Sequence, residues 1–138
     1  MSNLGPIQTN GATEATLEAI QVIIQSGLPT YTGRLNQYGE ILVPFSTETT
    51  IISYVVPTGK TFYVLGMKGW GDTNGEFFIK INGSIVGGDR STAADPSCQC
   101  DFTNAPIAAN AGSLITISVI TYVSATHTMR ANLLGGIV

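Results

Sequence analysis

Charged side chains are scarce in this chain of 138 residues. Lys, Arg, Asp and Glu make up 11% of it, whereas an ordinary soluble domain contains roughly 25%. The formal net charge is −3, and the six basic residues are scattered along the sequence. Binding to nucleic acid needs grouped Lys and Arg that displace counterions from phosphates. The sequence therefore argues against nucleic acid as a partner.

Long apolar runs are also missing. The longest ones run under about ten residues and contain Ser, Thr or Lys, whereas a membrane-spanning helix needs about 20 apolar residues. The first basic residue is Arg34, so the chain does not start with the charged region of a secretory signal. We expect a protein made in the host cytoplasm, with no membrane partner.

Residues that hold metals or act as nucleophiles are few. The chain has one histidine, His127, and two cysteines, Cys98 and Cys100, whereas a zinc site needs about four such ligands. The cysteine spacing puts both thiols on one face of a strand, so we expect buried apolar thiols. We expect His127 to be hydrogen-bonded in the core or at an interface. No serine lies in a G-x-S-x-G turn, and we predict no enzyme, no catalytic residue and no cofactor.

Apolar and small polar residues take the place of the missing charges. The mean hydropathy is +0.26, and Thr, Ser, Gly and Asn occupy the polar positions. Such a surface gives little electrostatic repulsion between molecules. This composition favours a protein that works within an assembly.

The N-terminal part contains the one segment that predicts a helix. After a flexible lead at residues 1–11, residues 13–26 place Leu17, Ile20 and Ile24 on one helical face. A helix of this length is marginal alone in water, so its apolar face needs a partner. That partner is the chain's own β domain, copies of the helix in a short bundle, or a neighbouring protein.

Residues 28–39 are rich in Pro and Gly and include Tyr31 and Tyr38. This composition predicts an extended linker. We therefore divide the chain into an N-terminal arm, residues 1–39, and a β domain, residues 40–138.

The β domain consists of short strand-like runs separated by turns, at residues 40–45, 49–56, 61–67, 76–81, 84–86, 98–102, 114–122 and 125–133. Asn82-Gly83 is a strong hairpin signal because both residues tolerate positive φ. About eight strands with no helix between them predict an antiparallel β-sandwich of jelly-roll type.

Some strands are apolar on both faces, above all at Phe62, Tyr63, Val64 and Leu65. One face of such a strand fills the sandwich core, so the other needs a second cover. We expect the arm or a neighbouring subunit to provide it.

Trp70 lies where a strand meets the turn at residues 71–75. An exposed aromatic ring there can stack on a sugar, and a buried one can anchor the core or a subunit interface. The turn also carries Asp72 and Asn74, whose oxygens are of the type that binds calcium, although a plain turn is the commoner use.

Three stretches of the β domain resemble small accessory proteins of tailed-bacteriophage virions: VPTGKTFYVLG at residues 56–66, GEFFIKING at 75–83, and API with AGSLITI at 105–107 and 111–117. The resemblance implies a head decoration (cement) protein. Such a protein would be a homotrimer on the outer surface of the virion's capsid, bound to the major capsid protein. It implies no catalytic residues.

Two functions follow as expectations. In the first, a capsid decoration protein bridges shell subunits through the arm and linker, with these candidate contacts: Leu17, Ile20, Ile24, Tyr31 and Tyr38. Removal of residues 1–39 should then leave a folded domain that no longer decorates shells. In the alternative, the chain is a carbohydrate-binding receptor module of a tail fibre or spike, with Trp70 as the sugar contact. A host-derived lectin-like or adhesive domain is a third class.

Overall fold

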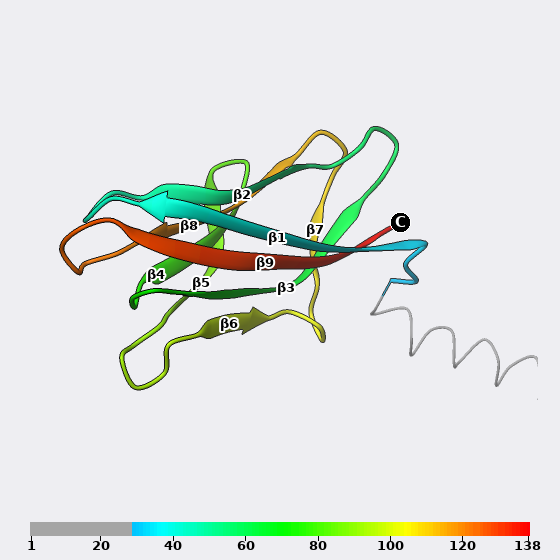
Figure 1. The fold of residues 1–138 in the computed structure, drawn as a ribbon. Coiled ribbons are helices and arrows are strands. Elements are labelled where there is room, and N and C mark those ends of the chain that lie inside the picture. Colours follow the sequence, from blue (N-terminus) through cyan, green and yellow to red (C-terminus); the bar gives the residue numbers. More distant parts are fainter. Residues whose placement is uncertain (1–28) are drawn as a thin grey trace, which may run out of the picture. The chain divides into compact units, whose positions relative to one another are not determined.

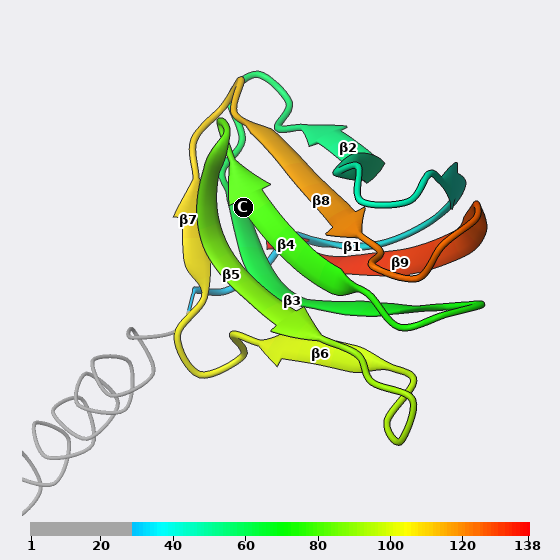
Figure 2. The same cartoon turned by 90° about the vertical axis from the view of Figure 1, so that its left-hand side faces the viewer.

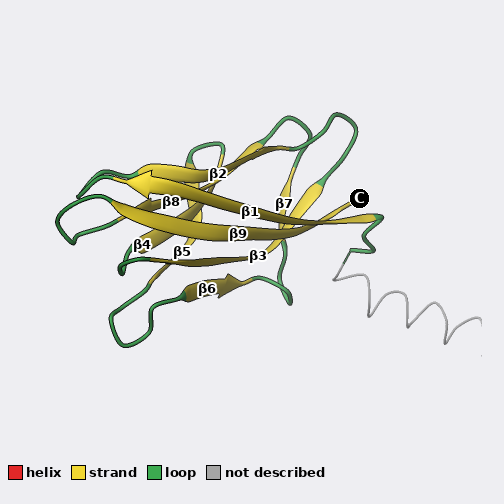
Figure 3. Cartoon of the chain, viewed as in Figure 1, coloured by secondary structure: helices red, strands yellow, loops and turns green. Residues whose placement is uncertain are grey.

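The computed structural model describes residues 29–138. These residues form two antiparallel β-sheets and contain no helix (Figures 1 and 3), which confirms the expected mainly-β class. The compact unit begins at Tyr31. Its strands are β1 (Gly33–Val43), β2 (Thr49–Val55), β3 (Phe62–Gly71), β4 (Glu76–Ile81), β5 (Ser84–Arg90), β6 (Cys98–Asp101), β7 (Ile107–Ala109), β8 (Leu114–Ile120) and β9 (His127–Ile137).

The first sheet has the strand order β1-β9-β3-β6, with β7 also paired to β3, and the second has the order β2-β8-β4-β5. Figure 2 shows the two sheets as separate layers. No helix in residues 29–138 is long and apolar enough to cross a membrane. The helix expected at residues 13–26 lies outside the described residues.

The core lies between the layers and takes alternate side chains from both sheets. Phe62 of β3 and Phe77 of β4 are its largest members, and both are fully buried. Successive strand residues point to opposite faces, which explains why every second residue of β4, β8 and β9 is buried. Burying each large apolar side chain contributes roughly 1.5–3 kcal/mol.

The hairpin expected at Asn82-Gly83 is confirmed. These two residues have φ values of 51° and 84°, and they join β4 to β5 in antiparallel register. Positive φ at both central positions gives the turn a twist that matches its flanking strands.

The prediction of a linker at residues 28–39 is wrong for the second half of that range. Strand β1 begins at Gly33 and pairs with β9 along its whole length. Gly39 does not break the strand but allows a close approach to β2, because a Cβ there would lie 2.7 Å from the Ile51 carbonyl oxygen. The segment between the strands expected at residues 84–86 and 98–102 likewise contains the second half of β5.

Strand β3 is apolar on both faces, and its own chain covers part of the face that points away from the core. Phe62 and Val64 are buried in the core, whereas Tyr63 and Leu65 are half-buried on the outer face. The ring of Tyr31 packs against that of Tyr63 with 5.9 Å between centroids. Tyr31 thus covers one of the two outward residues.

Candidate functional site

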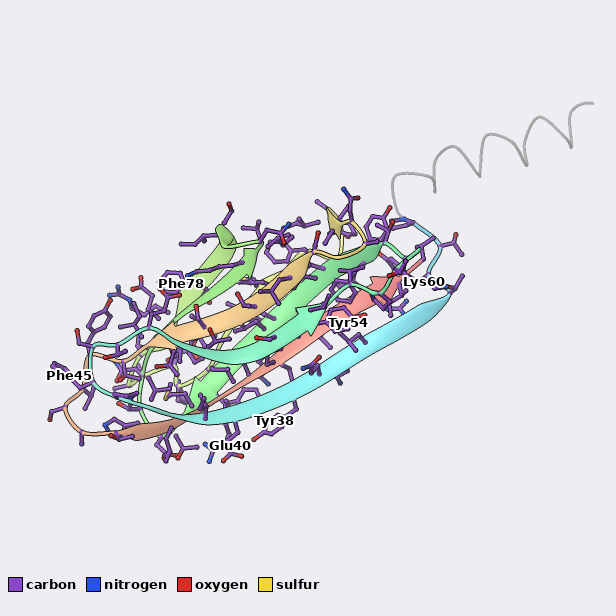
Figure 4. The ribbon with its side chains drawn as sticks, turned by 90° about the horizontal axis from the view of Figure 1, so that it is seen from above. Tyr38, Glu40, Phe45, Tyr54, Lys60 and Phe78 are labelled. Carbon is purple, nitrogen blue, oxygen red and sulfur yellow. The ribbon has the colours of Figure 1, made fainter. Side chains whose placement is uncertain are left out.

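The outer face of the first sheet carries a row of polar and aromatic residues from four strands. Tyr38 on β1 lies opposite Asn132 on β9, which lies opposite Lys68 on β3 and then Gln99 on β6. Paired residues in a sheet share a face. Figure 4 shows Tyr38 projecting from β1 on the side away from β2. We call this surface the outer face.

Trp70 and Tyr38 form an aromatic pair on the outer face. Their ring centroids are 6.0 Å apart with the planes at 42°, within the range of favourable aromatic contacts. Lys68 Nζ lies 5.9 Å from the Trp70 centroid. Tyr38 is 52% exposed, and Trp70 is half-buried. The pair therefore has a fixed position and an accessible surface.

Asn132 lies in the strand between the two aromatic residues. Its side-chain oxygen Oδ1 is buried and has no hydrogen-bond partner among the described residues. A buried acceptor without a donor costs about 1–3 kcal/mol.

Ion pairs fix the next row of the outer face. Arg130 on β9 lies 3.5 Å from a Glu40 oxygen and 3.4 Å from an Asp72 oxygen. The Tyr38 hydroxyl donates to Glu40 at 3.0 Å. The backbone N–H of Thr128, and then Arg130, hold the pKa of Asp72 below its ordinary value. Asp72 therefore serves as an anchor for β9, not as a proton donor near neutral pH.

Two hollows lie on the outer face, and Trp70 lines one of them. One of about 470 Å³ is lined by outward residues of four strands, including Arg34, Leu134, Lys68 and Asp101. The other, of about 390 Å³, is lined by Lys68, Trp70, Gly71, Pro96 and Ser97. Lys68 lines both, so the hollows adjoin through one side chain. We call them the large hollow and the Trp70 hollow.

The structure brings together two of the residues that the sequence singled out, Tyr38 and Trp70. It places Tyr31 elsewhere, against Tyr63 and with Arg34 5.3 Å from its ring centroid. The candidate contacts Leu17, Ile20 and Ile24 lie outside the described residues.

Sequence reasoning missed Lys68, Arg130 and Asn132. Alternation along β3 and β9 assigns each of them to the face opposite the core, and this signal was present. Alternation alone does not give the order of the strands in the sheet, which places β9 between β1 and β3.

Exposed apolar side chains form two clusters at opposite ends of β2. The first consists of Phe45, Tyr122 and Val123, which the pairing of Phe45 with Thr121 brings together. The second consists of Val55 and Leu114, which are 59% and 40% exposed and directly paired. Figure 4 shows Phe45 at the end of the β domain away from Lys60. We call them the Phe45 cluster and the Val55 cluster.

Within the described residues, the two thiols and the histidine have no arrangement that favours nucleophilic attack or metal binding. Burial, with Asp89 nearby, raises the pKa of Cys98 to about 12 and also raises that of Cys100. Both thiols are therefore protonated near neutral pH, a state that disfavours nucleophilic attack and metal binding. His127 is half-buried at the start of β9 and contacts the Ser124 carbonyl oxygen through Nε2 at 2.9 Å.

No three His, Cys, Asp or Glu side chains within residues 29–138 gather closely enough to hold a metal ion. Asp72, the candidate calcium ligand of the turn at 71–75, is engaged with Arg130 and the Thr128 N–H. Asp89 accepts from the Gln99 N–H at 3.3 Å. These carboxylates have structural partners within the chain.

Comparisons with known proteins give little further guidance. No family model matches the chain, and no curated protein matches it. Among solved structures, a crystal structure of PirA is similar over 70% of this chain and 92% of that chain, with 12% sequence identity and a TM-score of 0.43. A likeness this distant gives no basis for transferring a function.

Proposed function

We propose that this chain is a structural virion protein, a capsid decoration protein that stabilises an assembled phage head by bridging shell subunits. A jelly-roll fold is part of the proposal. The strand orders β1-β9-β3-β6 and β2-β8-β4-β5 support it, because a jelly roll has eight strands in two packed sheets. The stretches that resemble virion accessory proteins fall on β3, on the β4–β5 hairpin and on β7 and β8.

The observation that carries the proposal is the pair of exposed apolar clusters at opposite ends of β2. A strand of seven residues separates them, which corresponds to roughly 20 Å. Two separate apolar clusters suit a protein that contacts two neighbours at once. Binding only the assembled shell stabilises that state by mass action, and three-fold placement of a homotrimer multiplies weak contacts.

The proposal is tested with shells of the source phage assembled without this protein. Two double variants each remove one cluster: Phe45→Ser with Val123→Ser, and Val55→Ser with Leu114→Ser. Each should lower shell occupancy at least tenfold, because one contact alone no longer bridges. Ile85→Ser is the matched control, since Ile85 is 60% exposed outside both clusters. Electron microscopy of the particles gives the occupancy.

Full occupancy of the shell by both double variants would contradict the proposal that this protein bridges shell subunits. The role of the arm is tested separately with a chain that lacks residues 1–30, because removal of 1–39 would delete half of β1. This truncated protein should fold and lose decoration if the arm grips the shell. Mass photometry should show a trimer of the full chain.

A second candidate function is a carbohydrate-binding receptor module, and the Tyr38–Trp70 pair favours it. Aromatic rings with an apolar face and flanking polar groups suit a sugar ring. A glycan array with the full chain tests this candidate. Specific binding that disappears in Trp70→Ala supports it, and an empty array contradicts it.

A further inference from the structure

The large hollow lies over a row of the outer face that contains a glycine. In the row next to Tyr38, the paired residues are Asn36, Leu134, Gly66 and Asp101. Gly66 has no side chain, and a Cβ there would lie 2.8 Å from the Cys100 carbonyl oxygen. Gly66 therefore adds no side chain to the middle of this row. The volume of the large hollow, about 470 Å³, lies within the range of small-ligand sites.

Two cations line this hollow at different places: Arg34 lies over the ring of Tyr31, and Lys68 lies near the ring of Trp70. Of the basic residues, three form salt bridges within the chain: Lys80, Arg90 and Arg130. Neither Arg34 nor Lys68 has a carboxylate within salt-bridge distance among residues 29–138. Both line the large hollow, although the chain as a whole is acidic.

The acid that lines the same hollow has its own partners. Asp101 accepts from the backbone N–H of Thr103 at 2.9 Å and from the Thr103 hydroxyl. These hydrogen bonds hold the pKa of Asp101 below its ordinary value. Asp101 therefore stays ionised, and Arg34 and Lys68 leave the hollow with an excess of one positive charge.

The neutral lining suits hydroxyl groups. Asn36, Gln99 and Thr103 line the hollow, and amide and hydroxyl side chains both donate and accept hydrogen bonds. Lys68 continues from this hollow to the ring of Trp70. A ligand with hydroxyl groups, an apolar ring face and a negative charge would meet complementary groups along the outer face.

We propose that the outer face binds a carboxylated oligosaccharide, with one sugar ring on Trp70 and Tyr38 and carboxylates of adjoining units at Lys68 and Arg34. This inference names the ligand class of the second candidate function and rests on it. The aromatic pair supplies the affinity for sugar in general. The two cations supply the preference for acidic units.

The test uses two matched pairs of probes on the full chain. Tetragalacturonate is compared with its methyl ester, and sialyllactose with lactose, by isothermal titration calorimetry. The wild-type protein should bind at least one acidic probe at least tenfold more tightly than its neutral counterpart. The pair that shows this preference identifies uronic or sialic units as the source of the carboxylate.

Variants separate the two parts of the site. Arg34→Gln with Lys68→Gln should lose the acidic preference and retain the weaker neutral binding, and Trp70→Ala should lose both. Lys60→Gln is the control for the loss of a cation elsewhere, since Lys60 lines neither hollow. It should bind as the wild type does. Circular dichroism confirms that each variant is folded.

Each failure has a distinct meaning. Equal binding of acidic and neutral probes by the wild type overturns the inference and leaves carbohydrate binding in place. An acidic preference that persists in the Arg34 and Lys68 variant also overturns it, because the large hollow is then not the site. No binding of any probe overturns this inference, and an empty glycan array would in addition remove the carbohydrate-binding function.

Discussion

The two sheets share one core, but their outer faces use charge in different ways. On the second sheet, Lys80 pairs with Glu48, and Arg90 pairs with Glu76. On the first sheet, Arg130 pairs with Glu40 and Asp72, whereas Arg34 and Lys68 have no such partner among the described residues and line an open hollow. Cations that are neutralised in place stabilise the fold, whereas cations without a carboxylate partner are available to a ligand.

The comparison requires that the sheets form one cooperative unit, and core substitutions test this first. Phe62→Ala removes a fully buried ring of the first sheet, and Phe77→Ala removes one of the second. Each should lower the free energy of unfolding by about 3–5 kcal/mol, as measured by urea denaturation. Far-ultraviolet circular dichroism and Trp70 fluorescence should give one coincident transition. Two separate transitions would show that the sheets unfold independently.

Aromatic substitutions on the two outer faces sharpen the comparison. Trp70→Ala on the first sheet should weaken saccharide binding by about 2 kcal/mol, roughly thirtyfold. Phe78→Ala on the second sheet, whose ring is shown in Figure 4, should leave binding within about twofold. Titration calorimetry measures both. A larger loss in the Phe78 variant would move the binding face to the other sheet.

Substitutions of the carboxylates Glu48 and Glu40 should give the smallest change in the free energy of unfolding. Glu48 accepts from Lys80 and from the Ser118 hydroxyl at 2.7 Å, and Lys80 first, then Ser118, hold the pKa of Glu48 below its ordinary value. Glu48→Gln should cost about 1 kcal/mol of unfolding free energy at pH 7. Glu40→Gln should cost about half of that or less, because its ion pair with Arg130, at 3.5 Å, is exposed.

The pH dependence gives the sign of the Glu48 effect. A carboxyl whose pKa is lower in the folded protein stabilises it above the unfolded pKa, and this contribution is lost as the pH falls. The stability difference between wild type and Glu48→Gln should therefore shrink between about pH 5 and pH 3. Urea denaturation at several pH values measures it, and a difference that grows on acidification would contradict this role of Glu48.

Much of the fold was predictable from local sequence. Alternation marked β4 and β8, and Asn82-Gly83 marked the hairpin between β4 and β5, because both signals depend on neighbours in the sequence. Strand β1 was partly missed, since Gly33 and Gly39 resemble linker residues. At Gly39 the reason for glycine is the nearby backbone of β2, which only the three-dimensional structure reveals.

The candidate site was predictable only in pieces. Tyr38 and Trp70 were each singled out, but 32 positions separate them in the sequence. Their contact depends on β9, which inserts between β1 and β3 from the far end of the chain. Periodicity assigns a residue to a face, and it does not give the neighbouring strand.

The central claim about ligand binding is that the outer face of the first sheet is the saccharide-binding face. Amide hydrogen exchange of the full chain, with and without tetragalacturonate or sialyllactose, tests it most directly. The account predicts slower exchange along the middle of β1, along β3 from Leu65 to Trp70, and in β6, with no change in β2, β8 or β4. Protection confined to β2, β8 and β4 would contradict it.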